Sequence, residues 1–490
     1  MGHVLTKQRR SALIGPVLVL ATLVSSLISS FGAPLIPTVA HEFHASLSTA
    51  QWSLTVALLV GAASSPVLGR LGDGPRRRVT LLGGLAVVTV GGVVAAVASG
   101  WGGGFGWLLV GRGLQGVGLG LAPLAMATAR DELPTAKVAP MIALLSVSAG
   151  AGLGAGYPIS GWVADVWGLA GAYWFGAVVS GLALLCTAAV LPSGARRGAP
   201  DPLDWVGAVL LTLALVTVLV AVAEGTRWGW GSPAVVSLLA AGVVLGAVWA
   251  RQQLRAEHPL VQLRLLRHPS VLSADACAMV LGIAMYMVLS GVTEFVQSPR
   301  SGGFGFSASA VVAGLVLIPL SFFMLASSRA LPALVARMGT RAVLVLGCLV
   351  AAVGCGFFAV FHGALWQAFV MTGVLGVGLG TTFAAIPGLI VRAVPEGETG
   401  SALGFYQVVR FTGFSLGSAL AATVLAAQAD GDGHPAVGGY TSVLWVSAGF
   451  CVVAAALAWF PPDRASGRAP AERPSADAVR VPPRPGGDAA

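Results

Sequence analysis

Long apolar runs alternate with short polar loops along almost the whole chain. Fourteen of these runs are about 20 residues or longer, the length that crosses the hydrocarbon core of a membrane as a helix. They lie near residues 11–33, 48–69, 79–99, 105–127, 138–162, 170–191, 204–223, 232–250, 272–295, 308–328, 341–361, 366–391, 401–427 and 439–460. Because a spanning segment must satisfy its own backbone hydrogen bonds, helices are expected rather than strands. The pattern therefore predicts an all-α, polytopic membrane protein with fourteen transmembrane helices.

The 28 Lys and Arg side chains predict how these helices are oriented. If the N-terminus lies in the cytoplasm, 24 of them fall on that side, Arg227 and Arg300 fall on outer loops, and Arg112 and Arg410 lie within spans. This asymmetry follows the positive-inside rule, so both termini are predicted to be cytoplasmic. The net charge of +9 then reflects topology, and no basic soluble face remains for binding nucleic acid.

A short repeat indicates how the helices are grouped. The pentapeptide GVGLG occurs at 116–120 and at 376–380, each time before a Pro-containing apolar stretch and a short loop with an arginine. Chance recurrence in Gly-rich helices is one explanation. The other is a pair of parallel halves, a frequent transporter plan with the substrate site between them. On the second explanation we predict a six-helix bundle over 1–191, two inserted helices over 192–270, a second six-helix bundle over 271–460 and a disordered tail over 461–490.

Two arginines lie deep inside predicted spans. A charged side chain at the centre of a membrane helix costs about 2.5–3.5 kcal/mol, so Arg112 should face a partner or a water-filled path. The equivalent position of the second half is Thr372, so the helix itself does not require the arginine. Arg410 has Gln407 three residues before it, and the two are candidates for binding anionic or polar substrate groups in a central cavity.

The loop after the second span resembles a signature of the major facilitator superfamily, G-x-L-x-D-x-x-G-R-R/K. In GRLGDGPRRR, the residues Gly69, Asp73, Arg77 and Arg78 match, and Arg76 replaces the second glycine. The resemblance implies a transporter fold of two six-helix bundles. Physically, Asp73 can cap a helix end and close a cytoplasmic latch, while the arginines anchor to anionic lipid. The alternative is a positive-inside loop with an Asp cap.

The fourth span also resembles this superfamily, through the pattern L-x-x-x-R-x-x-Q-G. Leu108, Arg112, Gln115 and Gly116 match it, and in the resemblance the arginine belongs to the proton-coupling machinery. Gln115 lies on the same helix face and can help to solvate the guanidinium group. Alternatively, Arg112 has a structural role and bonds to backbone carbonyl groups that lock two helices together.

The fifth span resembles the motif of the drug antiporters, G-x-x-x-G-P-x-x-G-G. In AGAGLGAGYPISGW, the residues Gly152, Gly156 and Gly161 match, and Pro158 lies one position after the expected proline. Small residues at this spacing allow close helix approach, and a proline bends the span. The motif and the helix count point to the fourteen-span drug:proton antiporter group, although packing alone would also explain the glycines.

This antiporter group usually carries an acid in its first span, where the present chain has only serines. A proton site needs a carboxyl group that is shielded from water, because burial favours the neutral acid. Asp275 and Glu294, near the two ends of the ninth span, are the candidates, and Glu294 is the leading one. Each is also a possible ion-pair partner for Arg410.

We therefore expect a secondary active exporter of amphipathic drugs or antibiotics in the plasma membrane, driven by proton antiport and alternating access. The alternative is an importer or uniporter of a small metabolite. We expect a monomer whose partners are the small amphipathic substrate, protons and membrane lipid. Neither an enzyme site, a metal nor a cofactor is expected, because the sequence has no Walker A motif, no paired catalytic carboxylates and no histidine cluster.

Overall fold

Helices account for nearly all of the residues that the structure describes. The structure is a computed structural model, and it describes residues 2–29, 31, 35–45, 47–73, 76–191, 202–266, 268–300, 304–428 and 435–459. The predicted tail over 461–490 and most of the predicted linker over 192–203 lie outside these residues.

The first part of the chain forms one group of helices, which we call the first group. Its members are α1 (Gly2–Ser29), α2 (Ile36–Glu42), α3 (Leu47–Asp73), α4 (Arg77–Gly100), α5 (Gly104–Gly116), the short η2 (Val117–Gly120), α6 (Leu121–Glu132) and α7 (Thr135–Val190). Within it, α7 packs along both α1 and α4, and α5 packs against α3 and α4.

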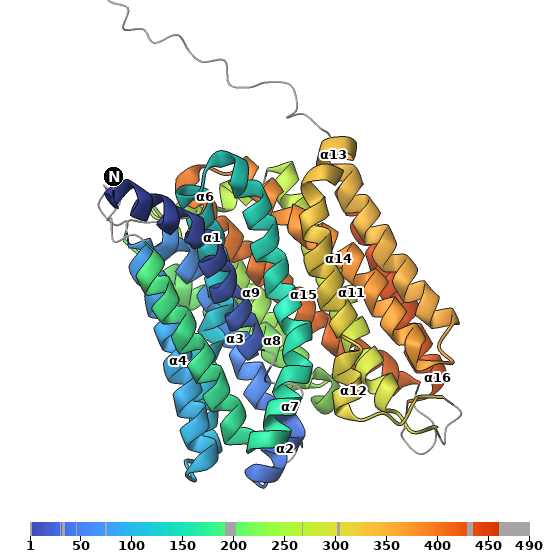
Figure 1. The fold of residues 1–490 in the computed structure, drawn as a ribbon. Coiled ribbons are helices and arrows are strands. Elements are labelled where there is room, and N and C mark those ends of the chain that lie inside the picture. Colours follow the sequence, from blue (N-terminus) through green and yellow to red (C-terminus); the bar gives the residue numbers. More distant parts are fainter. Residues whose placement is uncertain are drawn as a thin grey trace, which may run out of the picture.

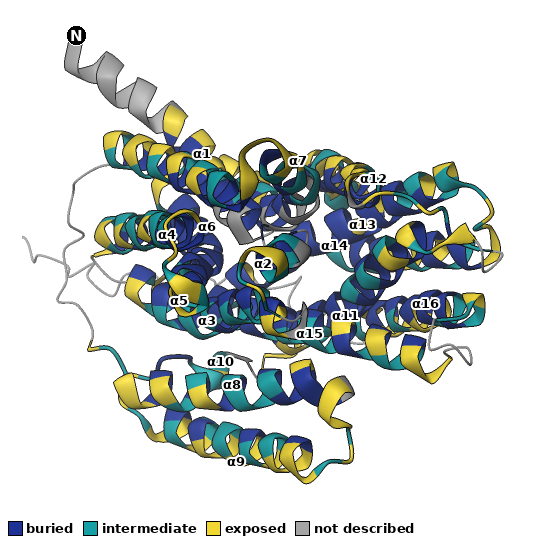
Figure 2. Cartoon of the chain, turned by 90° about the horizontal axis from the view of Figure 1, so that it is seen from below, coloured by how far each residue is buried: buried dark blue, intermediate teal, exposed yellow. Residues whose placement is uncertain are grey.

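A pair of helices and a second group follow. The pair is α8 (Trp205–Trp228) and α9 (Pro233–Arg255). The members of the second group are the short α10 (Leu263–Leu266), α11 (Pro269–Gln297), α12 (Ala310–Leu315), α13 (Ile318–Val360), α14 (Leu365–Ala393), η4 (Glu396–Glu398), α15 (Thr399–Ala427) and α16 (Val437–Trp459). The two groups lie side by side (Figure 1), and α8 and α9 flank them, with α8 against α3 and α15 (Figure 2).

Two glycines divide unusually long helices into arms. A straight helix of 56 residues, the length of α7, would be about 84 Å long, far more than a membrane's ~30 Å core. Gly168 has φ 70° and breaks α7, and Gly339 has φ 79° and breaks α13. Glycine suits these positions because positive φ strains residues with a Cβ atom. The predicted pairs 138–162 with 170–191 and 308–328 with 341–361 therefore each meet at one glycine.

Eleven helical segments of the described residues are long and apolar enough to cross a membrane. Two shorter apolar stretches, Leu13–Val24 and Thr135–Ser148, add to them. The chain is thus an all-helical, multi-pass membrane protein. We call the end of the bundle at which α1 begins and α3 ends the N face, and the opposite end the far face (Figure 1).

Both copies of GVGLG lie where two helices touch. A Cβ atom on Gly116 would collide with the carbonyl oxygen of Ala57 in α3, and one on Gly376 would collide with that of Leu320 in α13. Close approach of backbones at small residues is a common way to hold membrane helices together. In the first copy the helix also tightens into η2, which separates α5 from α6 and was not predicted.

Candidate functional site

A carboxylate from α3 caps the first turn of α15 at the N face. Asp73 accepts hydrogen bonds from the backbone N–H groups of Gly400 (2.6 Å) and Ser401 (2.8 Å). Free N–H groups and the positive end of the helix dipole make a helix N-terminus favourable for a carboxylate. Gly69 allows this approach, because a Cβ atom there would collide with the carbonyl oxygen of Gly400. The first and second groups are thereby joined at this end.

Further polar contacts lie beside this cap, and those of Arg70 and Arg130 also join the two groups. Arg70 forms an ion pair with Glu398 at 2.9 Å, and Gln262 donates a hydrogen bond to the same carboxylate at 2.7 Å. Arg130 donates to the Thr399 hydroxyl. We refer to Asp73, Arg70, Arg130 and their partners in η4 and α15 as the latch.

The three consecutive arginines after this cap lie in different surroundings. Arg77 is buried and forms an ion pair with Asp131 of α6, so it is not the lipid anchor that we expected. Arg78 donates to the Ala188 carbonyl at 2.8 Å, which ties α4 to α7. Arg76 is exposed and stays available for anionic lipid. The expectation failed for Arg77 because its aspartate lies 54 residues further along the chain.

Arg112 is completely buried within the first group. Its Nε donates to the Ser53 carbonyl of α3 at 3.1 Å, and its Nη1 donates to Gln115 Oε1 at 2.6 Å. The ring of Tyr173 from α7 lies 6.0 Å from the guanidinium carbon. The bond to Ser53 is the kind of contact that the structural alternative requires, and Gln115 solvates the charge as its spacing indicates.

Arg410 is also buried, but its neighbours are mostly aromatic. Its guanidinium carbon lies 5.1 Å from the ring centre of Phe383 and 5.3 Å from that of Phe414, with two further rings at 5.8 Å. Gln407 is buried one turn earlier on α15. Both line a small cavity whose opposite wall is formed by the first group, including Thr22 and Ser26 of α1.

The two candidate acids of α11 differ in exposure. Asp275 is buried, and its Oδ1 has no hydrogen-bond partner within the described parts of the chain. Glu294 is exposed at the far face, where the Tyr440 hydroxyl lies 3.5 Å from its carboxylate. Glu294 therefore lacks the shielding that we expected of a proton-carrying acid. Among the described residues neither acid forms an ion pair with Arg410.

The residues of the fifth-span motif have different neighbours in α7. A Cβ atom on Gly152 would press against Ser26 of α1, and Pro158 lies against Gly314 of α12 in the second group. Gly156 is buried. Gly161, in contrast, faces open space, so close helix packing does not explain it. The motif thus contacts α1 and the second group through Gly152 and Pro158.

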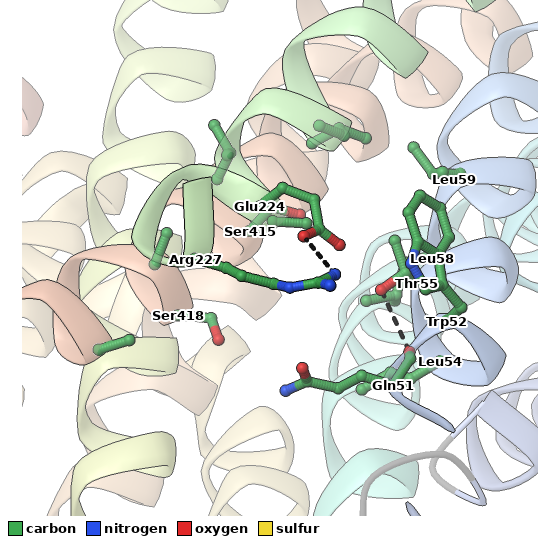
Figure 3. A pocket seen from close by; sticks show the side chains of 15 residues that line it. Gln51, Trp52, Leu54, Thr55, Leu58, Leu59, Glu224, Arg227, Ser415 and Ser418 are labelled. Carbon is green, nitrogen blue, oxygen red and sulfur yellow. Dashed lines mark hydrogen bonds and ion pairs between the residues drawn. The ribbon is translucent and has the colours of Figure 1, made fainter. Parts of the chain in front are cut away.

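A crevice of about 450 Å³ lies between α3, α8 and α15 (Figure 3). Its lining comes from the first turns of α3 and the last turns of α8, which places it in the half of the bundle near the far face. Glu224 and Arg227 of α8 form an ion pair at 3.3 Å and point toward α3 (Figure 3). The remaining polar lining is Gln51, Thr55, Ser415 and Ser418, and Trp52 with several leucines supplies the apolar part. Its volume is within the range of drug-sized binding sites.

Sequence reasoning missed this crevice. The available signal was polar side chains at helical spacing within apolar spans, Gln51 with Thr55 and Ser415 with Ser418. Nothing in the sequence places these two pairs opposite each other, or places α8 between them. The inserted pair was predicted as an addition to the bundle and supplies one wall of the crevice.

A membrane-embedded bundle that buries charged side chains along the seam between two helix groups is typical of a transporter. The sequence matches the family described as the Major Facilitator Superfamily over residues 18–418 and again over 333–486. The chain belongs to the Major Facilitator Superfamily and is a transporter.

Several relatives are named for export or resistance. The chain is 28% identical over 407 residues to the tetracenomycin C resistance and export protein of Streptomyces glaucescens, covering 81% of this chain and 73% of that protein. It is 27% identical to the multidrug resistance protein Stp of Mycobacterium tuberculosis, with 80% and 72% covered. It is also 27% identical to the probable actinorhodin transporter of Streptomyces coelicolor, with 79% and 68% covered.

The fold is also that of a solved structure. The human organic anion transporter MFSD10 aligns with a TM-score of 0.63, covering 91% of this chain and 99% of that one. The sequences are 15% identical, so this likeness concerns the fold alone.

Proposed function

We propose that the chain is a secondary active exporter of amphipathic drugs or antibiotics, driven by proton antiport across the plasma membrane. The observation that carries the proposal is a pair of features between α3 and α15: the latch joins these helices at the N face, and the crevice separates them toward the far face. A transporter that alternates its access needs one closed and one open side. The names of the relatives support export of antibiotics and drugs.

Fourteen membrane crossings are the proposed topology, as in the fourteen-span drug:proton antiporters. The breaks at Gly168 and Gly339 support it, because each divides one long helix into two arms that pass through the bundle in opposite directions (Figure 1). An even number of crossings places both termini on the same side of the membrane. The positive-inside count of 24 cations then assigns the N face to the cytoplasm.

The proposed domain plan keeps two six-helix halves, 1–191 and 271–460, with the inserted pair within 192–270. The matching helix contacts of Gly116 and Gly376 support two related halves. In this plan the crevice is the outer vestibule, the latch is the closed cytoplasmic gate, and the cavity at Arg410 and Gln407 belongs to the substrate path between the halves. Gly152 and Pro158 then contribute to the moving seam along α7, and the protein acts as a monomer.

For proton coupling we propose Asp275 as the acid, in place of Glu294, with Arg112 and Gln115 as the polar elements of the first half. Asp275 has the required burial and an unpaired carboxyl oxygen. Each proton that re-enters is driven by the membrane potential with about 2.3 kcal/mol per 100 mV, and a pH gradient adds to this. Outward movement of a drug against its gradient then has an energy source.

The test is a drug-susceptibility panel in a sensitive bacterial strain with and without the protein, repeated with a protonophore. We expect resistance to at least one amphipathic compound, lower accumulation of that compound in the cells, and loss of both effects with the protonophore. Higher accumulation on expression would contradict export. Export that persists when the proton gradient is collapsed would contradict antiport.

A further inference from the structure

Arg410 is a buried cation without an anionic partner in the part of the chain that the structure describes. Its side chain is 1% exposed, its Nε has no hydrogen-bond partner among the described residues, and its Nη1 lies 3.4 Å from the Tyr406 hydroxyl. Within the described ranges it forms no ion pair. Aromatic faces attract a guanidinium group but do not accept its N–H hydrogen bonds as a carboxylate would. A buried charge with an unused donor therefore favours an anion from outside the chain.

Gln407 supplies a second unused polar atom beside it. Its Oε1 is buried and accepts no hydrogen bond from any residue that the structure describes. Gln407 and Arg410 line the same cavity, so the residues with the unused donor and the unused acceptor both belong to its wall. A molecule that offers an anionic oxygen and a neighbouring hydroxyl would satisfy both.

The cavity lies at the seam between the two helix groups. Thr22 and Ser26 of α1 and Gly118 of η2 form its wall on one side, and α15 forms the other. Ser146 of α7 donates a 2.6 Å hydrogen bond to the carbonyl of Phe383, so a ring that faces Arg410 also sits on this seam. The volume of about 10 Å³ holds at most one water, so a larger molecule can enter only when the two walls separate.

The lining also selects the shape and charge of this molecule. The rings of Phe383, Tyr406, Phe411 and Phe414 have their centres 5.1–5.8 Å from the guanidinium carbon, and Phe411 also lines the cavity. Planar aromatic molecules stack favourably on such rings. The residues that line the cavity include no carboxylate to pair with a cation. A positively charged drug would meet the like charge of Arg410 instead.

We propose that the exported substrate is an aromatic anion with a carboxylate or phenolate oxygen next to a hydroxyl group. Arg410 binds the anionic oxygen, Gln407 accepts the hydroxyl hydrogen, and the surrounding rings hold the aromatic plane as the halves separate. This inference rests on the proposed function, since it names the substrate class of that same exporter.

The test measures binding of a hydroxynaphthoic acid with adjacent carboxyl and hydroxyl groups, and of its methyl ester, to the purified protein in detergent by fluorescence. We expect the parent protein to prefer the acid. Arg410→Gln should weaken binding of the acid by about tenfold or more, the size of one lost charge-assisted hydrogen bond, and binding of the ester by less than about twofold. Arg410→Lys should retain part of the preference, because it keeps the charge.

The matched control is Arg337→Gln, an exposed arginine of α13, which should leave both affinities unchanged. Gln407→Leu should weaken binding of the hydroxy acid more than binding of the same acid without its hydroxyl. Size-exclusion profiles show whether each variant is folded, and Arg410→Lys provides the comparison if Arg410→Gln is not.

Equal losses for acid and ester would overturn the proposal, because Arg410 would then only brace α15 against the ring of Phe383 in α14. A parent protein that binds the ester or a cationic dye better than the acid would also overturn it. The binding measurement uses no gradient and no cells. A failed export test with intact binding of the acid would therefore reject the proposed function, whereas active export with no preference for the acid would reject only this inference.

Discussion

Two arginines of this chain are buried within the membrane bundle with different kinds of neighbours. Arg112 has polar partners on its own side of the molecule, the Ser53 carbonyl and Gln115. Arg410 is surrounded by aromatic rings at the seam between the two groups. The hydrogen bonds of Arg112, at 3.1 and 2.6 Å, suit a fixed electrostatic role, whereas the longer 3.4 Å contact of Arg410 with the Tyr406 hydroxyl suits binding. The same residue type therefore has two proposed roles.

Arg112→Ala should affect both stability and coupling. The Ser53 carbonyl and Gln115 Oε1 lose their donor, which should lower the free energy of unfolding by about 1–3 kcal/mol. Transport in proteoliposomes with an imposed pH gradient should fall by about tenfold or more. The exposed Arg337→Gln is the control for both measurements. Reduced stability together with parental gradient-driven transport would leave Arg112 with only the structural role.

Asp275→Asn should remove the dependence of transport on the pH gradient. The amide has nearly the same shape as the acid but cannot release a proton, so exchange of substrate without a gradient should continue while gradient-driven accumulation is lost. Glu294→Gln is a matched control on the same helix, and because Glu294 is exposed we expect its pH dependence to stay parental. The reverse pattern, with Glu294→Gln uncoupled and Asp275→Asn parental, would restore our original choice of acid.

At the scale of elements, the important contact is that between the ends of α3 and α15. The N–H groups in the first turn of α15 have no carbonyl within the helix to which they can donate. Two of them donate instead to Asp73, which belongs to the first group. The cap is therefore available only in the state in which the N face is closed. A cap that exists in one state alone shifts the balance between states by its own free energy.

Asp73→Asn should loosen the latch. Loss of the negative charge at the helix N-terminus is worth about 1 kcal/mol, which should change the ratio of closed to open molecules by roughly fivefold. Hydrogen exchange measured by mass spectrometry should then speed up over residues 399–404 by a similar factor. Glu132→Gln, an exposed acid at the same face, should leave this exchange unchanged. Unaltered exchange in Asp73→Asn would show that the cap does not control the gate.

The elements could be predicted from the sequence more completely than their partners. The length of apolar runs predicts where helices lie, because it is a local property of the chain. The partners of Asp73 lie 327 and 328 residues further along, so its capping role is predictable but its target is not. The crevice depends on α3, α8 and α15 meeting, and Arg77 was misjudged for the same reason. Local patterns carry no information on which distant backbone atoms come into contact.

At the scale of the whole molecule, the latch and the crevice lie at opposite ends of one interface between α3 and α15. The inserted pair and the segment after it contact both ends: α8 lines the crevice, and Gln262, between α9 and α10, binds Glu398 of the latch at 2.7 Å. A movement that opens the N face would thus also pull on the segment that connects the pair to α11. The pair is therefore placed to move with the halves.

The proposed topology predicts which turns are accessible from each side of the membrane. Epitope tags inserted at Gly168 and Gly231 should be stained on intact spheroplasts, and tags at Glu257 and Gly339 only after permeabilisation. The reason is that the first two turns lie at the far face and the last two at the N face. If α13 crossed once with Gly339 inside the membrane, that tag would be inaccessible from both sides, and the count of fourteen would be wrong.

The crevice also determines how this protein can be blocked. Because it lies in the half of the bundle toward the face that we assign to the outside of the cell, we expect that an inhibitor can wedge between α3, α8 and α15 from that side, without first crossing the lipid bilayer. Large, membrane-impermeant molecules such as antibody fragments or cyclic peptides are then suitable blockers. Given together with an exported antibiotic, such a wedge would raise the concentration of that antibiotic inside the cell.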